Sequence, residues 1–169
     1  TPEVAEYVEQ HIIMPTIVAM SQEDRPFQGV LYFGLMLTPS GPKVLEYNAR
    51  FGDPEAQVVL PRLKTDLVSI CNAVIDEKLS DISIEWEDNA AVCVIMASGG
   101  YPQEHNIGYK IYGIEDACQL DNVMVFHAGT KRMGEDMITA GGRVLGVTAV
   151  GSDLDHAIKK AYEGVQKIF

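Results

Sequence analysis

The sequence of 169 residues has few basic side chains, few cysteines and no long apolar run. Lys and Arg together number 13 against 24 Asp and Glu, which gives a formal net charge of -11. Duplex nucleic acid is bound by clustered Lys and Arg, so nucleic acid is excluded as a main partner. No apolar run approaches the roughly 20 residues of a membrane-spanning helix, so we expect no membrane partner. An acidic protein can still bind phosphates through metal ions and backbone amides, so a nucleotide ligand stays open.

The three cysteines, Cys71, Cys93 and Cys118, are odd in number and have no CxxC spacing. Neither a disulfide framework nor a zinc site is therefore indicated. Each lies in an apolar stretch, which predicts buried thiols in a reducing, cytoplasmic protein. The chain opens on Thr1-Pro2 without a signal peptide pattern, and we expect that it starts inside a longer protein.

Helices are predicted in both halves of the chain. Residues 1–21 have a capping Thr1 and an apolar face, and Pro15 should kink or split the helix. Asp53-Pro54-Glu55 is typical of a helix start, with Asp53 as the cap. Further helices are expected over residues 66–79 and 153–168.

Strands follow a different pattern in the two halves. Residues 29–38 and 43–51 flank a Pro-Ser-Gly-Pro turn and predict a hairpin. After Ser80 come short β segments with Gly-rich breaks between them. These segments are residues 82–86, 90–97, 109–112, 123–126 and 142–150.

This organisation predicts an α/β (α+β) fold with a boundary near residues 79–81. Residues 1–79 would form a helix, a β-hairpin and further helices. Residues 80–169 would form a small β-rich domain closed by a helix. We expect its strands 90–97 and 142–150 to lie in a sheet separate from the hairpin.

The second hairpin strand carries the most informative pattern. Side chains alternate between the two faces of a strand. The apolar face would hold Leu45, Tyr47, Ala49 and Phe51, and the other face Glu46, Asn48 and Arg50. A solvated face with a surface Glu–Arg pair is one interpretation. The apolar flanks favour a buried hairpin, whose polar groups would then need partners.

Those three polar residues suit phosphoryl transfer. A carboxylate and a side-chain carbonyl are ligands that Mg²⁺ accepts. A guanidinium two residues further on can bind a phosphoryl oxygen. Glu46, Asn48 and Arg50 thus indicate a site in which a metal ion and a cationic side chain both bind a phosphate group.

The stretch Leu-Glu-Tyr-Asn-Ala-Arg-Phe-Gly-Asp-Pro-Glu-Ala-Gln over residues 45–57 resembles phosphoribosylamine–glycine ligases of the ATP-grasp superfamily. Residues 28–32, 97–102, 126–130 and 141–145 resemble the same family. The resemblance covers essentially the whole chain and implies the C-terminal part of an ATP-grasp domain, followed by the family's C-terminal domain.

The resemblance implies a role for each site residue. Glu46 and Asn48 would ligate Mg²⁺ (or Mn²⁺) bridging the ATP phosphates, and Arg50 would be catalytic, facing the acyl phosphate. Gly52, Asp53 and Glu55 would bind substrate, with free amides of the following helix start available to an anion. Many ATP-grasp enzymes add a second acidic ligand about a dozen residues upstream, but residues 32–36 contain no acid.

The reaction implied by the resemblance joins glycine to 5-phosphoribosylamine with ATP hydrolysis, through glycyl phosphate, in de novo purine biosynthesis. The family's N-terminal lobes have no counterpart here and are expected in the same polypeptide or a companion chain, so the chain alone should be inactive. Two alternatives stay open. One is a non-catalytic structural fragment that does not bind ATP alone. The other is the equivalent part of another ATP-grasp ligase, such as a biotin carboxylase.

Overall fold

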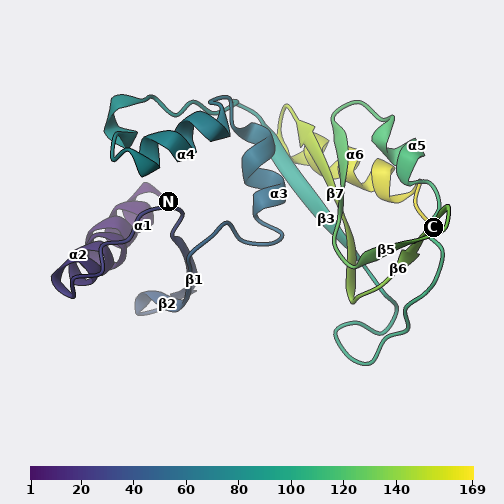
Figure 1. Ribbon diagram of the computed structural model, residues 1–169, viewed down its shortest axis with the longest axis horizontal. Helices are drawn as coiled ribbons and strands as arrows, with labels where there is room; N and C mark the ends of the chain where they lie inside the picture. Colours follow the sequence, from purple (N-terminus) through teal and green to yellow (C-terminus); the bar gives the residue numbers. More distant parts are fainter. The chain divides into compact units, whose positions relative to one another are not determined.

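A computed structural model describes all 169 residues as a mixed helix and sheet fold with antiparallel sheets, as the sequence predicts (Figure 1). Contacts divide the chain into two compact units. The first unit comprises Thr1–Gly52 and Asp66–Ser83, and the second Asp53–Thr65 and Ile84–Phe169. Residues 53–65 thus group with the later part of the chain. The domain boundary near residues 79–81 stays a prediction. No helix is long and apolar enough to cross a membrane.

The first unit begins with a helix in three sections. α1 spans Pro2–Val8, a π-helical turn spans Glu9–Ile13, and α2 spans Met14–Gln22. The predicted split is confirmed, because the π-helical turn ends just before Pro15. Pro15 offers no N–H to the preceding turn and its ring crowds that turn, which is a recognised cause of such a break.

The hairpin consists of β1 (Tyr32–Thr38) and β2 (Gly41–Asn48) in a two-stranded antiparallel sheet. The turn is only Pro39 and Ser40, so β2 begins earlier than predicted, and it also ends earlier. The expectation of a buried hairpin is wrong. No other strand pairs with it, and Leu45 and Tyr47 are 64% and 51% exposed.

α4 (Leu67–Ile75) and a 3₁₀ turn at Leu79–Asp81 complete the helices of the first unit. As predicted, the helix begins at Asp66, whose carboxylate accepts hydrogen bonds from the Ser69 amide and hydroxyl at 2.7 and 2.9 Å. This bonding holds the pKa of Asp66 below its usual value.

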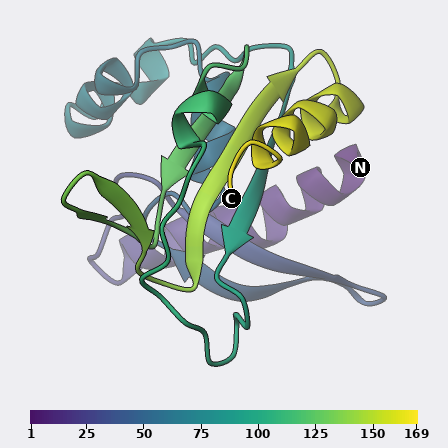
Figure 2. The ribbon, with the colours of Figure 1, turned by 90° about the vertical axis from the view of Figure 1, so that its right-hand side faces the viewer.

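The second unit is built on an antiparallel sheet in the order β3-β7-β4, separate from the hairpin as expected (Figure 2). β3 spans Ala90–Ala97, β7 Arg143–Gly151 and β4 Val123–His127. β7 lies at the centre and pairs with both neighbours. Its run of apolar residues is typical of a strand covered on both faces.

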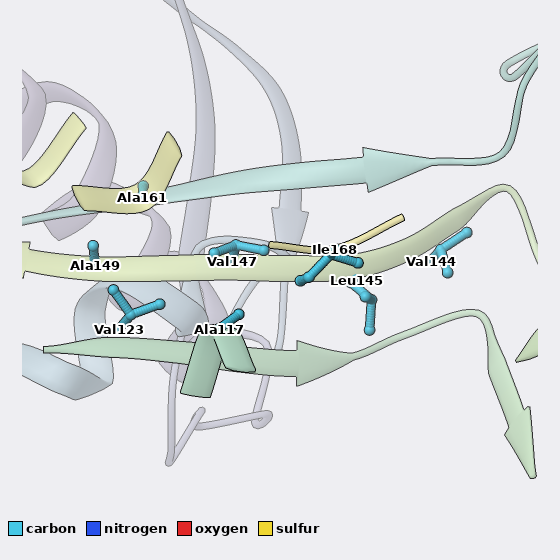
Figure 3. Close-up of a cluster of buried hydrophobic side chains, with 8 residues drawn as sticks. All are labelled: Ala117, Val123, Val144, Leu145, Val147, Ala149, Ala161 and Ile168. Atoms are coloured by element: carbon cyan, nitrogen blue, oxygen red, sulfur yellow. The ribbon is translucent and has the colours of Figure 1, made fainter. Parts of the chain in front are cut away.

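α6 (Leu154–Val165) packs on this sheet and closes the core (Figure 3). Asp153 caps it by accepting a hydrogen bond from the His156 amide at 2.8 Å. A Cβ at Gly164 would lie 2.9 Å from both Val123 and Val147, so glycine allows the helix to approach the sheet. The core cluster comprises Ala117, Val123, Val144, Leu145, Val147, Ala149, Ala161 and Ile168.

Several short elements complete the second unit. They are α3 (Ala56–Val59), a 3₁₀ turn (Leu60–Arg62), α5 (Ile114–Cys118), β5 (Thr130–Met133) and β6 (Asp136–Thr139). The predicted strands 82–86 and 109–112 are wrong, because each makes only one isolated bridge, Leu63 to Trp86 and Lys110 to Ile138. The short, polar β5–β6 hairpin gave no apolar alternation from which to predict it.

The prediction of three buried thiols is also wrong. Cys71 and Cys118 are exposed and Cys93 is half-buried. Cys71 lies on α4, where the only buried residue is Ala73, and Cys118 is the last residue of α5. An apolar neighbourhood in the sequence does not bury a side chain when its helix has few packing partners.

Candidate functional site: a polar strand end and a clamped turn

Glu46 and Asn48 project from the last three residues of β2, on the same face of the strand. The Asn48 side-chain nitrogen donates a hydrogen bond to Glu46 Oε1 at 3.1 Å. This bond orients the amide, so that its oxygen is the atom left to bind a cation. Glu46 is exposed and Asn48 half-buried, so both reach solvent.

The pairing of β1 with β2 sets the direction of the Glu46 side chain. Gly34 of β1 lies directly opposite it, and the next pair is Leu35 with Val44. Leu45 has no partner in this register and is the extra residue of a β-bulge. Bulges bend a strand and redirect a side chain, and they are frequent beside active sites. The predicted alternation therefore holds from Glu46 to Asn48 but not through Leu45.

This pair of ligands fits Mg²⁺. The ion is commonly held by one or two side-chain ligands and completes its shell with water and substrate phosphates. β1 contributes no acid, and no group of three or more His, Cys, Asp or Glu side chains is arranged for a metal ion. The residues present thus suit an ion that shares its coordination with a phosphate.

Arg50 lies two residues beyond the end of β2, in a bend. Its Nη1 donates to the Phe51 carbonyl at 2.9 Å, and the exposed guanidinium makes no ion pair with a carboxylate. A guanidinium has five N–H donors. Arg50 therefore keeps donors available for a phosphoryl oxygen.

The expected substrate residues fall in both units. Gly52 is the last residue of the first unit's opening segment and is buried, whereas Asp53 and Glu55 belong to the second unit. Asp53 is not the helix cap that the sequence predicts. α3 begins only at Ala56, after a cis Asp53–Pro54 peptide bond, and its cap position, Glu55, makes no capping side-chain bond.

Two of the amides at the start of α3 are used within the turn. The amides of Gln57 and Val58 donate to the carbonyls of Pro54 and Glu55. α3 has only four residues. The expected anion site at this helix start stays a prediction.

Asp53 is instead held by a side chain four residues further along the chain and by another that is distant in sequence. Gln57 Nε2 donates to Asp53 Oδ1 at 2.7 Å, and Arg143 Nη2 lies 3.2 Å from Asp53 Oδ2. Arg143 Nη1 also donates to the Asp53 carbonyl at 3.0 Å. The guanidinium therefore binds both the backbone and the carboxylate of the turn, a two-point contact that a lysine cannot reproduce.

A second residue of β7 holds the same segment. Thr148 is fully buried, and its hydroxyl donates to the Gln57 carbonyl at 3.1 Å. Gln57 Oε1 is buried without a hydrogen-bond partner. Sequence reasoning assigned no role to Arg143 or Thr148. The stretch 141–145 supported the family resemblance, but only the fold brings it to residues 53–57.

Cys93 of β3 contacts this group. Burial raises the pKa of its thiol, Asp53 adds to the increase, and a side-chain hydrogen bond with Thr148 opposes it. A thiol with a raised pKa is a poor nucleophile at neutral pH.

The Gly-rich stretch after β3 is a turn. Ser98 donates from its amide to the Gly142 carbonyl at 2.8 Å and from its hydroxyl to the Gly141 carbonyl at 2.8 Å. Both donors are therefore used within the protein, which favours a structural role over a phosphate cradle.

Two family profiles match the chain. Residues 1–56 match "Phosphoribosylglycinamide synthetase, ATP-grasp (A) domain", and residues 91–169 match "Phosphoribosylglycinamide synthetase, C domain". The phosphoribosylamine–glycine ligase of Rhodopirellula baltica is 53% identical over 162 residues, which is 95% of this chain and 37% of that protein. The ligase of Clostridium acetobutylicum is 48% identical over 168 residues, which is 99% of this chain and 39% of that protein. The chain belongs to the phosphoribosylglycinamide synthetase family.

Solved structures agree with membership of the phosphoribosylglycinamide synthetase family. The crystal structure of phosphoribosylamine–glycine ligase from Thermotoga maritima matches 90% of this chain and 37% of that chain, with a TM-score of 0.70 and 32% identity. N5-carboxyaminoimidazole ribonucleotide synthetase from the same organism has a TM-score of 0.55 at 15% identity, which is a likeness of fold alone. The chain spans less than two-fifths of the length of these relatives.

Within the family profiles, Glu46, Asn48 and Arg50 belong to the A domain, whereas Arg143 and Thr148 belong to the C domain. Asp53 lies near the end of the A-domain match, yet its partner Arg143 lies within the C-domain match.

Proposed function

We propose that this chain is the part of a phosphoribosylamine–glycine ligase that carries its metal-binding strand and C-terminal domain. The complete ligase joins glycine to 5-phosphoribosylamine with hydrolysis of ATP, in de novo purine biosynthesis. The observation that carries the proposal is the arrangement on β2, where the Asn48 amide turns its nitrogen to Glu46 and leaves its oxygen for a cation. Family membership selects this reaction over others of the ATP-grasp superfamily.

In the proposed reaction the glycine carboxylate attacks the γ-phosphorus of ATP and forms glycyl phosphate with release of ADP. The amino group of phosphoribosylamine then attacks the acyl carbon, and phosphate leaves. Glu46 and Asn48 would hold Mg²⁺ or Mn²⁺, which would neutralise charge on the ATP phosphates. Arg50 would donate hydrogen bonds to the transferred phosphoryl group, because phosphoryl transfer depends mainly on positioning and charge stabilisation.

Gly52, Asp53 and Glu55 would form the substrate turn. The hydrogen bonds from Gln57 and Arg143 support this role by fixing the Asp53 carboxylate and carbonyl. The lobes that enclose the nucleotide in the family would come from the same polypeptide or from a companion chain. The three unpaired cysteines are compatible with a cytoplasmic location, which is part of the proposal.

The site assignment is tested by Glu46→Ala in the complete ligase. We expect loss of Mg²⁺-dependent turnover, because Asn48 alone has no charge with which to hold the ion. Asn48→Ala should be milder, and Arg50→Ala should slow acyl transfer more than it weakens nucleotide binding. Glu9→Ala, the same change at another exposed glutamate of the first unit, is the control and should leave turnover intact. Near-normal turnover of Glu46→Ala at saturating Mg²⁺ would show that this face is only a solvated surface.

The alternative is a structural fragment without catalysis of its own. We expect the isolated chain to show no glycine-dependent release of phosphate from ATP. The lobes that enclose the nucleotide would come from sequence outside these 169 residues. The assay contains purified chain, ATP, Mg²⁺, glycine and phosphoribosylamine. Turnover in the usual enzyme range of roughly 1–10³ s⁻¹ would show instead that the chain is sufficient.

A further inference from the structure

We propose that Gly34 is a positioning residue, whose missing side chain provides the space in which the Glu46 side chain lies. Gly34 and Glu46 are opposite each other in the β1–β2 register. A Cβ at position 34 would lie 2.9 Å from Glu46 Cγ and 3.6 Å from Glu46 Oε1. Real Cβ atoms do not approach so closely, so any other residue at this position would displace the Glu46 side chain. The inference rests on the proposed function, because it concerns the same carboxylate.

The backbone at Gly34 does not itself require glycine. Gly34 is not among the glycines with a positive φ, which include Gly29 and Gly41 of the same unit. Glycine inside a strand weakens the strand, because it offers no side chain to pack and more freedom to the unfolded chain. The space that it leaves beside Glu46 is a reason for glycine at this position.

Two neighbouring features define the position of the carboxylate together with Gly34. The bulge at Leu45 immediately precedes Glu46, and the Asn48 amide donates to Glu46 Oε1. An alanine at position 34 would force Glu46 to rotate about its χ1 bond. That rotation carries Oε1 away from Asn48 and separates the two proposed ligands.

The consequence is a site with one acidic side chain, Glu46, whose position depends on Gly34 of the facing strand. Residues that orient metal ligands usually change metal affinity by about 10- to 100-fold when they are altered. Gly34→Ala should therefore act on metal affinity while leaving the fold intact, since Glu46 is an exposed side chain that is free to rotate.

Gly34→Ala is tested by two measurements. In the metal-free chain, NMR of the Asn48 side-chain amide reports its bond to Glu46. We expect Gly34→Ala to shift these signals as Glu46→Ala does, with an unchanged melting temperature. In the complete ligase, we expect the Mg²⁺ concentration for half-maximal turnover to rise about tenfold.

Gly99→Ala is the matched control. A Cβ at Gly99 meets no atom within 4 Å and its φ is not positive, so neither measurement should change. If Gly34→Ala leaves both the Asn48 signals and the Mg²⁺ requirement unchanged, the inference is overturned. If the Asn48 signals move but Glu46→Ala retains full turnover, Gly34 still positions Glu46 and the proposed metal role of Glu46 fails.

Discussion

Leu45 and Leu145 lie on β2 and β7, the strands that carry candidate functional residues in the two units, but their surroundings differ. Leu145 is 1% exposed in the core under α6, whereas Leu45 is 64% exposed in a two-stranded sheet. The second unit has a core of its own, to which β3, β4, α5 and α6 contribute. In the first unit Ala73 is the only buried hydrophobic residue.

The difference between the cores of the two units agrees with how much of each family domain the chain contains. The C-domain profile matches residues 91–169, and these residues form a sheet covered by helices. The second unit exposes eleven large apolar side chains, and the first unit, of which residues 1–52 lie within the A-domain match, also leaves eleven exposed. Those of the first unit are Tyr7, Met14, Ile17, Val18, Met36, Leu37, Leu45, Tyr47, Val68, Ile75 and Leu79.

Replacing a leucine with alanine should destabilise the two units to very different extents, and this is the largest effect that we expect. Leu145→Ala should destabilise the second unit by about 2–5 kcal/mol, because it opens a cavity in a closed core. Leu45→Ala should cost less than about 1 kcal/mol in this chain, because little buried surface is lost. Denaturant unfolding, resolved by hydrogen exchange at β7 and β2, measures both. Equal losses at the two positions would contradict the contrast between the units.

Glycines with positive φ provide the next comparison. At Gly113, with φ 81°, an added Cβ would clash with the Lys167 carbonyl oxygen, so Gly113→Ala should cost about 2–3 kcal/mol. At Gly41, with φ 95°, nothing lies within 4 Å, and Gly41→Ala should cost only about 1 kcal/mol of backbone strain. Thermal unfolding of both variants tests whether the second unit is the more tightly packed.

Arg143→Met tests the clamp on the substrate turn. The Arg143–Asp53 pair is 41% and 50% exposed at its side chains, so global stability should fall by less than about 1 kcal/mol. The amides of residues 53–57 should nevertheless exchange faster, and kcat/KM of the complete ligase should fall by up to about 100-fold through misplacement of the turn. Arg143→Lys keeps the charge without the planar fork and should recover little. Unchanged exchange in Arg143→Met would remove the positioning role.

The smallest expected effect is the acid sensitivity of the helix caps. Bonding to the His156 amide and the Ser152 hydroxyl holds the pKa of Asp153 below its usual 3.8. A lowered pKa stabilises the fold above the unfolded value, and this contribution disappears as pH falls through the folded value, hence below about pH 4. Asp153→Asn and Asp66→Asn keep an acceptor but cannot titrate. Helix content measured from pH 5 to 2 should fall less steeply in each variant than in the parent.

The sequence predicts elements well where the deciding interactions are local. The Pro15 break, the cap at Asp66, the strand at 90–97 and the helix after Asp153 all depend on residues within a few positions. The exposed state of Leu45 was not predictable in this way, because burial depends on whether other strands flank the hairpin. The bulge at Leu45 arises from cross-strand pairing, which local alternation does not specify.

The candidate site shows the same limit. The ligands Glu46 and Asn48 could be proposed from their spacing and from the family resemblance. Asp53 fitted the pattern of a helix cap, yet its partner Arg143 lies 90 residues further along the chain. Gly34 offered no chemistry of its own, and only the register places it against Glu46.

The hairpin of β1 and β2 has one further consequence, which concerns association. A two-stranded sheet has an unpaired row of N–H and C=O groups along each outer side, and each row is a template for another strand. In the chain alone, the same rows lie beside exposed Leu37 and Leu45, a combination that favours strand-to-strand aggregation at high concentration. The strand that carries the proposed metal ligands is thus also an unpaired sheet edge at which strands of other molecules could add.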